Sequence, residues 1–505
     1  MKKLIILLLT LISYNSVSKI RLPEIINEYQ PALLPIISPN GDELFFSRKW
    51  HPENTGGISD DDDVWVSIRK SNNEWNKPVK LEETINKPTS NSLLYIFPDG
   101  NKVLLSGEYY KKEAQLAITQ INVNYFAIAK RINGKWQKPE PLFIEDFYNK
   151  SKNYSATIST DGKVLIMSLQ REDSFGSLDL YISFYNPETK TFSKPANLGN
   201  KINSKGVEIA CFLAYDSKTL YFASNGRNGK GKFDLYLTRR LDDTWGNWSD
   251  PIPLDFINSQ WDENSLSLNL TGDTAYFTSG DSISGREGIY FAVLPNEFRP
   301  LPYLVIQGEI LSVDGNSTAK INVPAAFKID NFETDYVFYD TVYNSNYRFV
   351  VPNNTQYNFF VSAKNYNDYS FSTSSSKFVE PAIQNYNITL RRIKENKTFI
   401  GRIYFETDKD SLNKKSFIRL KKLIEKINQE KLSKILVVGH TDELGTEEYN
   451  LQLSIRRAEN TAKVIKSILN LPDDIFEIQG KGKSEPISRD FSKNRRVEIY
   501  LVGYE

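Results

Sequence analysis

The sequence predicts a multidomain, mainly β protein: a five-bladed β-propeller, with six blades as the alternative count, then a small β-sandwich and an α/β domain. Three observations support this. A turn followed by an apolar strand recurs five times before residue 300, alternating strand patterns fill residues 301–395, and strands alternate with amphipathic helices after Thr398. Aromatic residues make up 13% of the chain, a bias that favours strands.

The repeated unit begins with a turn whose residues suit tight hairpins: Asn-Gly, Asp-Gly, Asp-Gly, Asp-Ser and Thr-Gly. The five units start at Ser38, Phe97, Ser159, Ala214 and Asn269. A second strand follows in each, at residues 63–68, 125–130, 179–184, 234–239 and 288–293. The units recur every ~50–60 residues and close on an aromatic residue and a proline, which is the size of a propeller blade.

Residues 28–300 resemble the WD-type repeats of TolB-like propellers. The second repeat matches least well, because its loop at residues 108–123 is long and lacks the aspartate that precedes the second strand in other repeats. The segment LPEIINEYQ, residues 22–30, resembles the piece that follows each closing proline. We therefore expect the N-terminal segment to complete the last blade.

Strand patterns without the repeat follow at residues 303–315, 347–366 and 385–393. Their layout resembles the carboxypeptidase-regulatory-like family of small sandwiches. The resemblance implies a spacer without catalytic residues.

The last part predicts the order βαβαββ, a mixed sheet with helices on one face. Its first helix is expected to bury Phe417, Leu420, Ile424 and Ile427, which are three or four positions apart. Residues 398–505 resemble the OmpA C-terminal-like family. The matching motifs are YFETDKDSL at Tyr404, GHTDELG at Gly439, YNLQLSIRRA at Tyr449, QGKGKSEP at Gln479 and NRRVEI at Asn494. This resemblance implies peptidoglycan binding.

A candidate site lies in the GHTDELG and YNLQLSIRRA motifs. Asn450, Ser454 and Arg457 share one stripe of the second helix, and Asp442 ends the strand before it. A carboxylate suits an ammonium group and a guanidinium suits a carboxylate, so the two could line one pocket. The resemblance implies that Asp442 and Arg457 bind the zwitterionic end of diaminopimelate in the peptide stem, with Thr441 and Asn450 in support.

Other interpretations of these residues remain open. Asp442 and Arg457 could form an internal ion pair, and Arg456 and Arg495 could be surface charges without a ligand. His440 is expected to hold the loop. No metal, cofactor or catalytic residue is predicted in this domain.

The start of the chain has the features of a secretory signal peptide. Lys2 and Lys3 precede an apolar run at residues 4–12, and the small residues 16–18 favour cleavage after Ser18. A membrane anchor is the alternative, but that run is shorter than the ~20 residues needed to span a bilayer. The predicted parts are a signal peptide at 1–18, a propeller at 19–300, a sandwich at 301–395 and an OmpA-like domain at 396–505.

Two further features were weighed for chemistry. The acidic run from Asp60 to Asp63 could bind calcium, although a solvated turn is the preferred interpretation. Cys211, the single cysteine, excludes an intrachain disulfide and is expected to be a packed core thiol. The formal net charge of +1 gives no support for a nucleic-acid partner.

Together these patterns predict a non-enzymatic periplasmic scaffold associated with the outer membrane and cell wall. It would bind peptidoglycan through its C-terminal domain and an envelope protein through its propeller. The alternative is a propeller-based hydrolase or lyase acting on envelope glycans or peptides, in which a serine triad would have to use His51. A third possibility is a subunit of a stator, secretion or gliding machine.

Overall fold

The computed structural model describes residues 19–27, 32–59, 62–71, 74–109, 126–280, 287–314, 317–331, 336–353, 355–374, 380–393, 395–427 and 434–504. The expected signal peptide and most of the long loop of the second repeat lie outside these residues. The chain divides into two compact units. The first comprises residues 1–312, 316–364 and 368–390, and the second comprises residues 313–315, 365–367 and 391–505.

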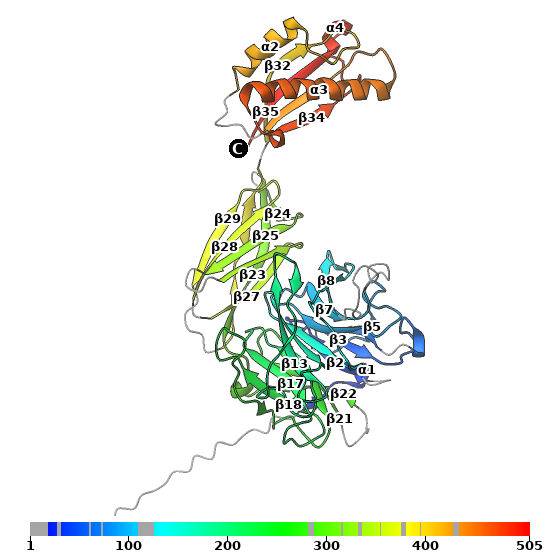
Figure 1. Ribbon diagram of the computed structural model, residues 1–505, viewed down its shortest axis with the longest axis vertical. Coiled ribbons are helices and arrows are strands. Elements are labelled where there is room, and N and C mark those ends of the chain that lie inside the picture. Colours follow the sequence, from blue (N-terminus) through cyan, green and yellow to red (C-terminus); the bar gives the residue numbers. More distant parts are fainter. Residues whose placement is uncertain are drawn as a thin grey trace, which may run out of the picture. The chain divides into compact units, whose positions relative to one another are not determined.

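The repeats of the first unit form five antiparallel sheets (Figure 1). Sheet one contains β2 (Ala32–Ile37), β3 (Glu43–Arg48), β4 (Asp63–Ile68) and β5 (Val79–Lys80). Sheet two contains β6 (Ser92–Ile96), β7 (Lys102–Ser106), β8 (Phe126–Ile132), β9 (Lys135–Trp136) and β10 (Glu140–Pro141). Sheet three contains β11 (Ser155–Ile158), β12 (Val164–Leu169), β13 (Asp179–Asn186), β14 (Thr191–Phe192) and β15 (Ala196–Asn197).

Sheets four and five follow the same plan. Sheet four contains β16 (Glu208–Leu213), β17 (Thr219–Ser224), β18 (Asp234–Arg239) and β19 (Ile252–Pro253). Sheet five contains β20 (Glu263–Leu268), β21 (Thr274–Gly280), β22 (Glu287–Val293) and β1 (Ile20–Arg21). The pairing of β1 with β22 confirms that the N-terminal segment completes the last sheet, although the strand precedes the segment expected to form it. The short helix α1 (Glu24–Asn27) follows β1.

The predicted hairpin turns share one backbone conformation. In every repeat the second turn residue has a positive φ, which glycine accommodates without strain in four of the repeats and serine adopts in the fourth. These residues are Gly41 (φ 79°), Gly100 (φ 70°), Gly162 (φ 72°), Ser217 (φ 51°) and Gly272 (φ 67°). Each turn therefore reverses the chain between the first two strands of its sheet.

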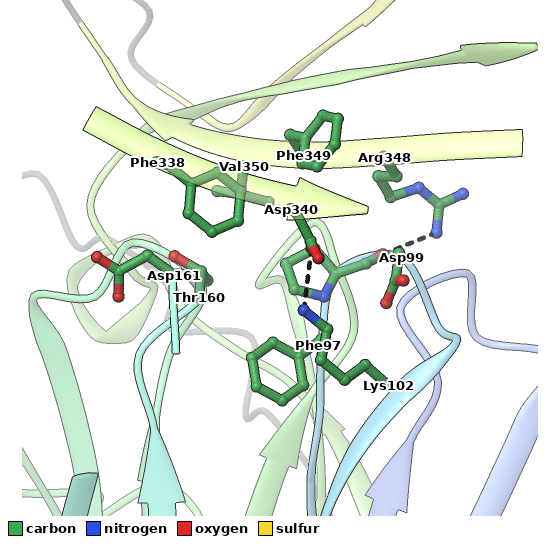
Figure 2. A pocket seen from close by; sticks show the side chains of 11 residues that line it. Phe97, Asp99, Lys102, Thr160, Asp161, Phe338, Asp340, Arg348, Phe349 and Val350 are labelled. Atoms are coloured by element: carbon green, nitrogen blue, oxygen red, sulfur yellow. Dashed lines mark hydrogen bonds and ion pairs between the residues drawn. The ribbon is translucent and has the colours of Figure 1, made fainter. Parts of the chain in front are cut away.

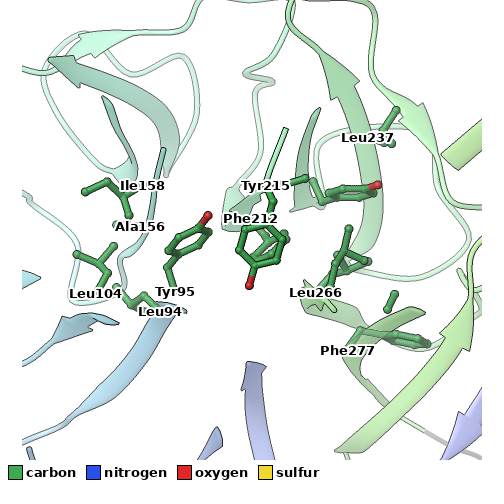
Figure 3. Packing of buried hydrophobic residues seen from close by; sticks show 14 of the residues in the cluster. Leu94, Tyr95, Leu104, Ala156, Ile158, Phe212, Tyr215, Leu237, Leu266 and Phe277 are labelled. Carbon is green, nitrogen blue, oxygen red and sulfur yellow. The ribbon is translucent and has the colours of Figure 1, made fainter. Parts of the chain in front are cut away.

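The first strands of the five sheets contact one another in cyclic order: β2 with β6, β6 with β11, β11 with β16, β16 with β20, and β20 with β2. A small apolar cavity of about 30 Å³ lies among all five strands, lined in part by Leu34, Leu93, Ala156, Ala210 and Leu266. Aromatic rings pack beside it, and Figure 3 shows Tyr95, Phe212 and Tyr215 grouped together. The core thus fills the centre of the ring of strands.

Two sheets form the second part of this unit. One contains β23 (Tyr303–Asp314), β24 (Ser317–Lys320), β27 (Asn346–Pro352), β30 (Ala382–Asn385) and β31 (Ile388–Arg391). The other contains β25 (Ala325–Asn331), β26 (Tyr336–Val342), β28 (Gln356–Ala363) and β29 (Tyr369–Ser374). Tyr303, Val305 and Val350 belong to the same hydrophobic cluster as the repeat residues, so the core is continuous.

The second unit has the predicted βαβαββ order, with one short helix, α4, added between the last two strands (Figure 1). Its elements are β32 (Glu395–Tyr404), α2 (Lys414–Ile424), β33 (Lys434–Gly439), α3 (Glu447–Leu469), β34 (Phe476–Gly480), α4 (Phe491–Asn494) and β35 (Arg496–Tyr504). The sheet order is β32-β35-β33-β34, and only the β33–β34 pair is parallel.

One core beneath α2 and α3 contains Leu420, Val437, Ile465 and Ile499, so both helices cover one face. Phe417 differs from expectation, because 37% of it is exposed and Lys421 lies over its ring. The structure places it beside the buried stripe of α2 rather than on it.

Candidate functional site

The candidate site lies where β33 runs into the loop before α3. A Cβ added at Gly439 would lie 1.9 Å from the carbonyl oxygen of Ser454, so only glycine allows α3 to pack this close to the strand. The Ser454 hydroxyl accepts a hydrogen bond from the Gly482 amide at 3.0 Å, and the Thr441 amide donates to the Gly482 carbonyl at 2.8 Å. These contacts fix the backbone that carries Asp442.

Asp442 forms an ion pair with Arg495. The Arg495 Nη1 donates to Oδ2 of Asp442 at 2.8 Å, and the two side chains are 15% and 7% exposed. Among the described residues, the other carboxylate oxygen has one long contact, 3.4 Å, from the Leu444 amide. One face of this carboxylate therefore retains capacity for a further donor.

Arg457 is fully buried next to this pair. It donates to three main-chain carbonyls: Nε to Lys409 at 2.8 Å, Nη1 to His440 at 3.0 Å and Nη2 to Glu406 at 3.2 Å. Burial lowers the pKa of Arg457 to about 10; the Asp442 carboxylate opposes this shift and Arg495 adds to it. A guanidinium has five N–H groups, so these contacts leave two for another acceptor.

The supporting residues have mainly structural contacts. Asn450 is buried and its Nδ2 donates to the Leu444 carbonyl at 2.9 Å, which braces the loop. The Thr441 hydroxyl is buried and has no hydrogen-bond partner among the described residues. Arg456 points to the surface and pairs with Asp410 at 3.0 Å.

Arg495 is the residue that sequence analysis left undecided. The alternative of an internal ion pair between Asp442 and Arg457 is not seen; Arg495 is the ion-pair partner of Asp442. The pairing of Gly439 with Val497 places the start of β35 beside the end of β33. Arg495 lies immediately before β35. The antiparallel pairing of β33 with β35 is therefore the signal that could have identified Arg495 as the partner of Asp442.

His440 lies two positions before Asp442 in the chain. Its ring is buried, and neither nitrogen has a hydrogen-bond partner among the described residues. Burial lowers its pKa to about 4, and the nearby Arg496 contributes to the shift. Arg496 also donates to Glu498 at 2.9 Å. The side chain of His440 is therefore a neutral packing element at pH 7.

The other candidates carry no site. Within the described ranges, no cluster of three or more His, Cys, Asp or Glu side chains is arranged to hold a metal. Asp60 and Asp61 of the acidic run lie outside those ranges. Cys211 is buried, which raises its pKa to about 12, and the prediction of a packed core thiol is confirmed.

Comparisons agree with the assignment of the second unit. Residues 404–499 match the model of the OmpA family. The chain is similar to outer membrane protein A of Bordetella avium, with 36% identity over 105 residues that cover 20% of this chain and 54% of that protein. It is also similar to the peptidoglycan-associated lipoprotein of Mesorhizobium japonicum, with 34% identity over 107 residues, 20% of this chain and 63% of that protein.

The matched segment thus spans little more than half the length of these relatives. Among solved structures, the chain is similar to the peptidoglycan-associated lipoprotein of Burkholderia pseudomallei, with 29% identity. The aligned region covers 21% of this chain and 89% of that protein's chain, and the TM-score is 0.18. The second unit is an α/β domain with a loop that carries charged side chains. This chain carries an OmpA family domain at its C-terminal end.

Proposed function

We propose that the protein is a non-enzymatic periplasmic scaffold that binds the diaminopimelate stem of peptidoglycan and anchors an envelope assembly to the cell wall. The observation that carries this proposal is the Asp442–Arg495 pair above the buried Arg457. It lies in a domain similar to proteins named for their association with peptidoglycan.

The charges suit a zwitterionic ligand. An ammonium group can bind Asp442 at the oxygen that has only one long contact. The ligand carboxylate can accept from the remaining N–H groups of Arg457 and from Arg495. Each charge-assisted hydrogen bond would contribute roughly 1.5–3 kcal/mol. Because Arg457 is buried in the unliganded protein, ligand entry requires a segment that covers it to shift, and Glu406 and Lys409 belong to one segment that contacts it.

We infer that the five sheets form a five-bladed propeller of the TolB-like type. The cyclic contacts of the five first strands and closure by β1 support this inference. A ring held in this way is rigid, and the loops between its strands offer a surface for a protein partner. That partner would be an outer-membrane or envelope protein.

The contacts of His51 do not favour the enzymatic alternative. Its Nδ1 accepts a hydrogen bond from the Glu53 amide at 3.1 Å, and its ring packs against Trp65 with centroids 4.5 Å apart. A serine triad requires Nδ1 to donate to a carboxylate instead.

Among the described residues, no helix is both long and apolar enough to cross a bilayer.

The proposal is tested by sedimentation with insoluble peptidoglycan. The full chain should co-sediment with peptidoglycan. Asp442→Asn should lose most of this binding, because a neutral amide cannot form an ion pair with the ligand ammonium. Arg456→Gln is the matched control, since Arg456 is an exposed arginine one position from Arg457. If Asp442→Asn sediments with peptidoglycan as fully as Arg456→Gln does, the proposal is overturned.

A further inference from the structure

A cleft of about 280 Å³ opens between the second repeat sheet and the sandwich. The residues that line it on the sandwich side include Ala326, Tyr339, Thr341 and Tyr343, and Lys130 of β8 lines it on the repeat side. Its size is near the lower end of small-ligand sites. All of these residues belong to the first compact unit.

The seam beside the cleft is held by specific contacts (Figure 2). Lys102 of β7 pairs with Asp340 of β26 at 2.9 Å. Arg348 of β27 donates to the Pro98 carbonyl at 3.3 Å. The walls of the cleft are therefore fixed relative to each other.

The tyrosines present their rings to solvent. Tyr339 is 68% exposed and Tyr343 is 36% exposed. In the strand register, Lys328 lies opposite Tyr339 on one side and Phe360 on the other. Phe360, 41% exposed, therefore stands roughly 10 Å from Tyr339, two strand spacings across the sheet. The aromatic surface continues from the cleft along the open face of the sandwich.

The cleft also carries a positive charge. The Nζ of Lys130 lies 5.7 Å from the centre of the Tyr343 ring. Asp340 is already paired with Lys102, and Lys328 is paired with Asp330 at 2.8 Å. No carboxylate partner of Lys130 is found among the described residues, so this ammonium can meet an anionic ligand.

We propose that this cleft binds a pyranose sugar that carries a carboxylate. A pyranose ring has a C–H face that packs on an aromatic ring and hydroxyl groups at its edge. The tyrosines take the ring face, the Thr341 hydroxyl takes a sugar hydroxyl, and Lys130 takes the carboxylate. The site is separate from Asp442 and does not depend on the C-terminal unit.

Two sources supply this chemistry, the muramic acid of cell-wall glycan and the uronic acids of other polysaccharides. The test is calorimetric titration of the full chain with stem-free glycan strands, tetragalacturonate and neutral chitotetraose. We expect one or both acidic glycans to bind about tenfold more tightly than the neutral one. Binding of the stem-free strands indicates muramic acid as the ligand, and binding of tetragalacturonate indicates a uronic acid.

Variants locate the site. Tyr339→Ala and the cavity-filling Ala326→Tyr should each weaken binding about tenfold, and Lys130→Gln should remove the preference for acidic glycans. Tyr185→Ala is the control, because Tyr185 is 37% exposed and lies in sheet three. Asp442→Asn should leave oligosaccharide binding unchanged. Absence of binding by all three glycans, or full binding by Tyr339→Ala and Ala326→Tyr, would overturn the proposal.

Discussion

Arg495 donates to Asp442 across 2.8 Å, although 53 positions separate them in the chain. Asp442 follows β33 and Arg495 precedes β35, and these antiparallel strands bring the two residues together. The pair holds the carboxylate in place while leaving one oxygen poorly satisfied. A preformed carboxylate beside two arginines loses little conformational entropy when a ligand binds.

Replacement of Arg457 should destabilise the C-terminal unit. Arg457→Met keeps the linear shape but removes three hydrogen bonds to carbonyls, one of them the carbonyl of the buried His440. We expect a loss of about 3–5 kcal/mol in the free energy of unfolding, measured by urea titration. Arg456→Met is the control and should change stability by less than about 1 kcal/mol, because its pair with Asp410 is exposed. Equal losses in both would contradict the assigned roles.

The pH dependence of stability should reveal His440. Its pKa is lowered from 6.5 to about 4, so between these values the unfolded chain binds more protons than the folded one. Stability is therefore complete above pH 6.5 and falls as the pH drops toward 4, by roughly 3 kcal/mol. Glutamine takes up no proton in this pH range. The free energy of unfolding of the C-terminal unit of His440→Gln should therefore not fall with pH by this amount. An identical profile would show that His440 is not the group responsible.

Lys19 should stabilise the last repeat sheet. Its Nζ contacts Glu263 at 2.7 Å, and Glu263 is fully buried. Lys19→Met would leave this carboxylate without its cation, so we expect a loss of about 2–4 kcal/mol for the first unit in urea titration. Glu24→Gln is the control, because Glu24 is 74% exposed in its pair with Arg21. Faster proteolysis near the N-terminus should accompany only the Lys19 change.

The Lys102–Asp340 pair should couple the repeat sheets to the sandwich. Burial by itself lowers the pKa of Lys102, but Asp340 and Asp99 together raise it above its ordinary value. A double-mutant cycle with Lys102→Met and Asp340→Asn should give a coupling energy of about 1–2 kcal/mol. The exposed Lys320–Glu309 pair provides a control cycle that should give less than about 0.5 kcal/mol. No coupling at the seam would mean that the two parts move independently.

The sequence by itself determined the local elements. Turn residues fixed the five hairpins, alternation fixed the strands, and the spacing of Leu420 and Ile424 fixed a buried helix face. Motif order assigned the C-terminal domain and drew attention to Asp442 and Arg457. These features depend on residues close together in the chain, where steric preference and periodicity act directly.

Only the tertiary structure decided which charges meet. Strand order makes Arg495, rather than Arg457, the ion-pair partner of Asp442. The cleft between the second repeat sheet and the sandwich exists because β8 and β26 come close together. Contacts of this kind join residues far apart in sequence, so no local pattern encodes them. Burial then determines the partners of each charge: the buried Arg457 donates to backbone carbonyls, while one oxygen of Asp442 accepts a single long contact from the Leu444 amide.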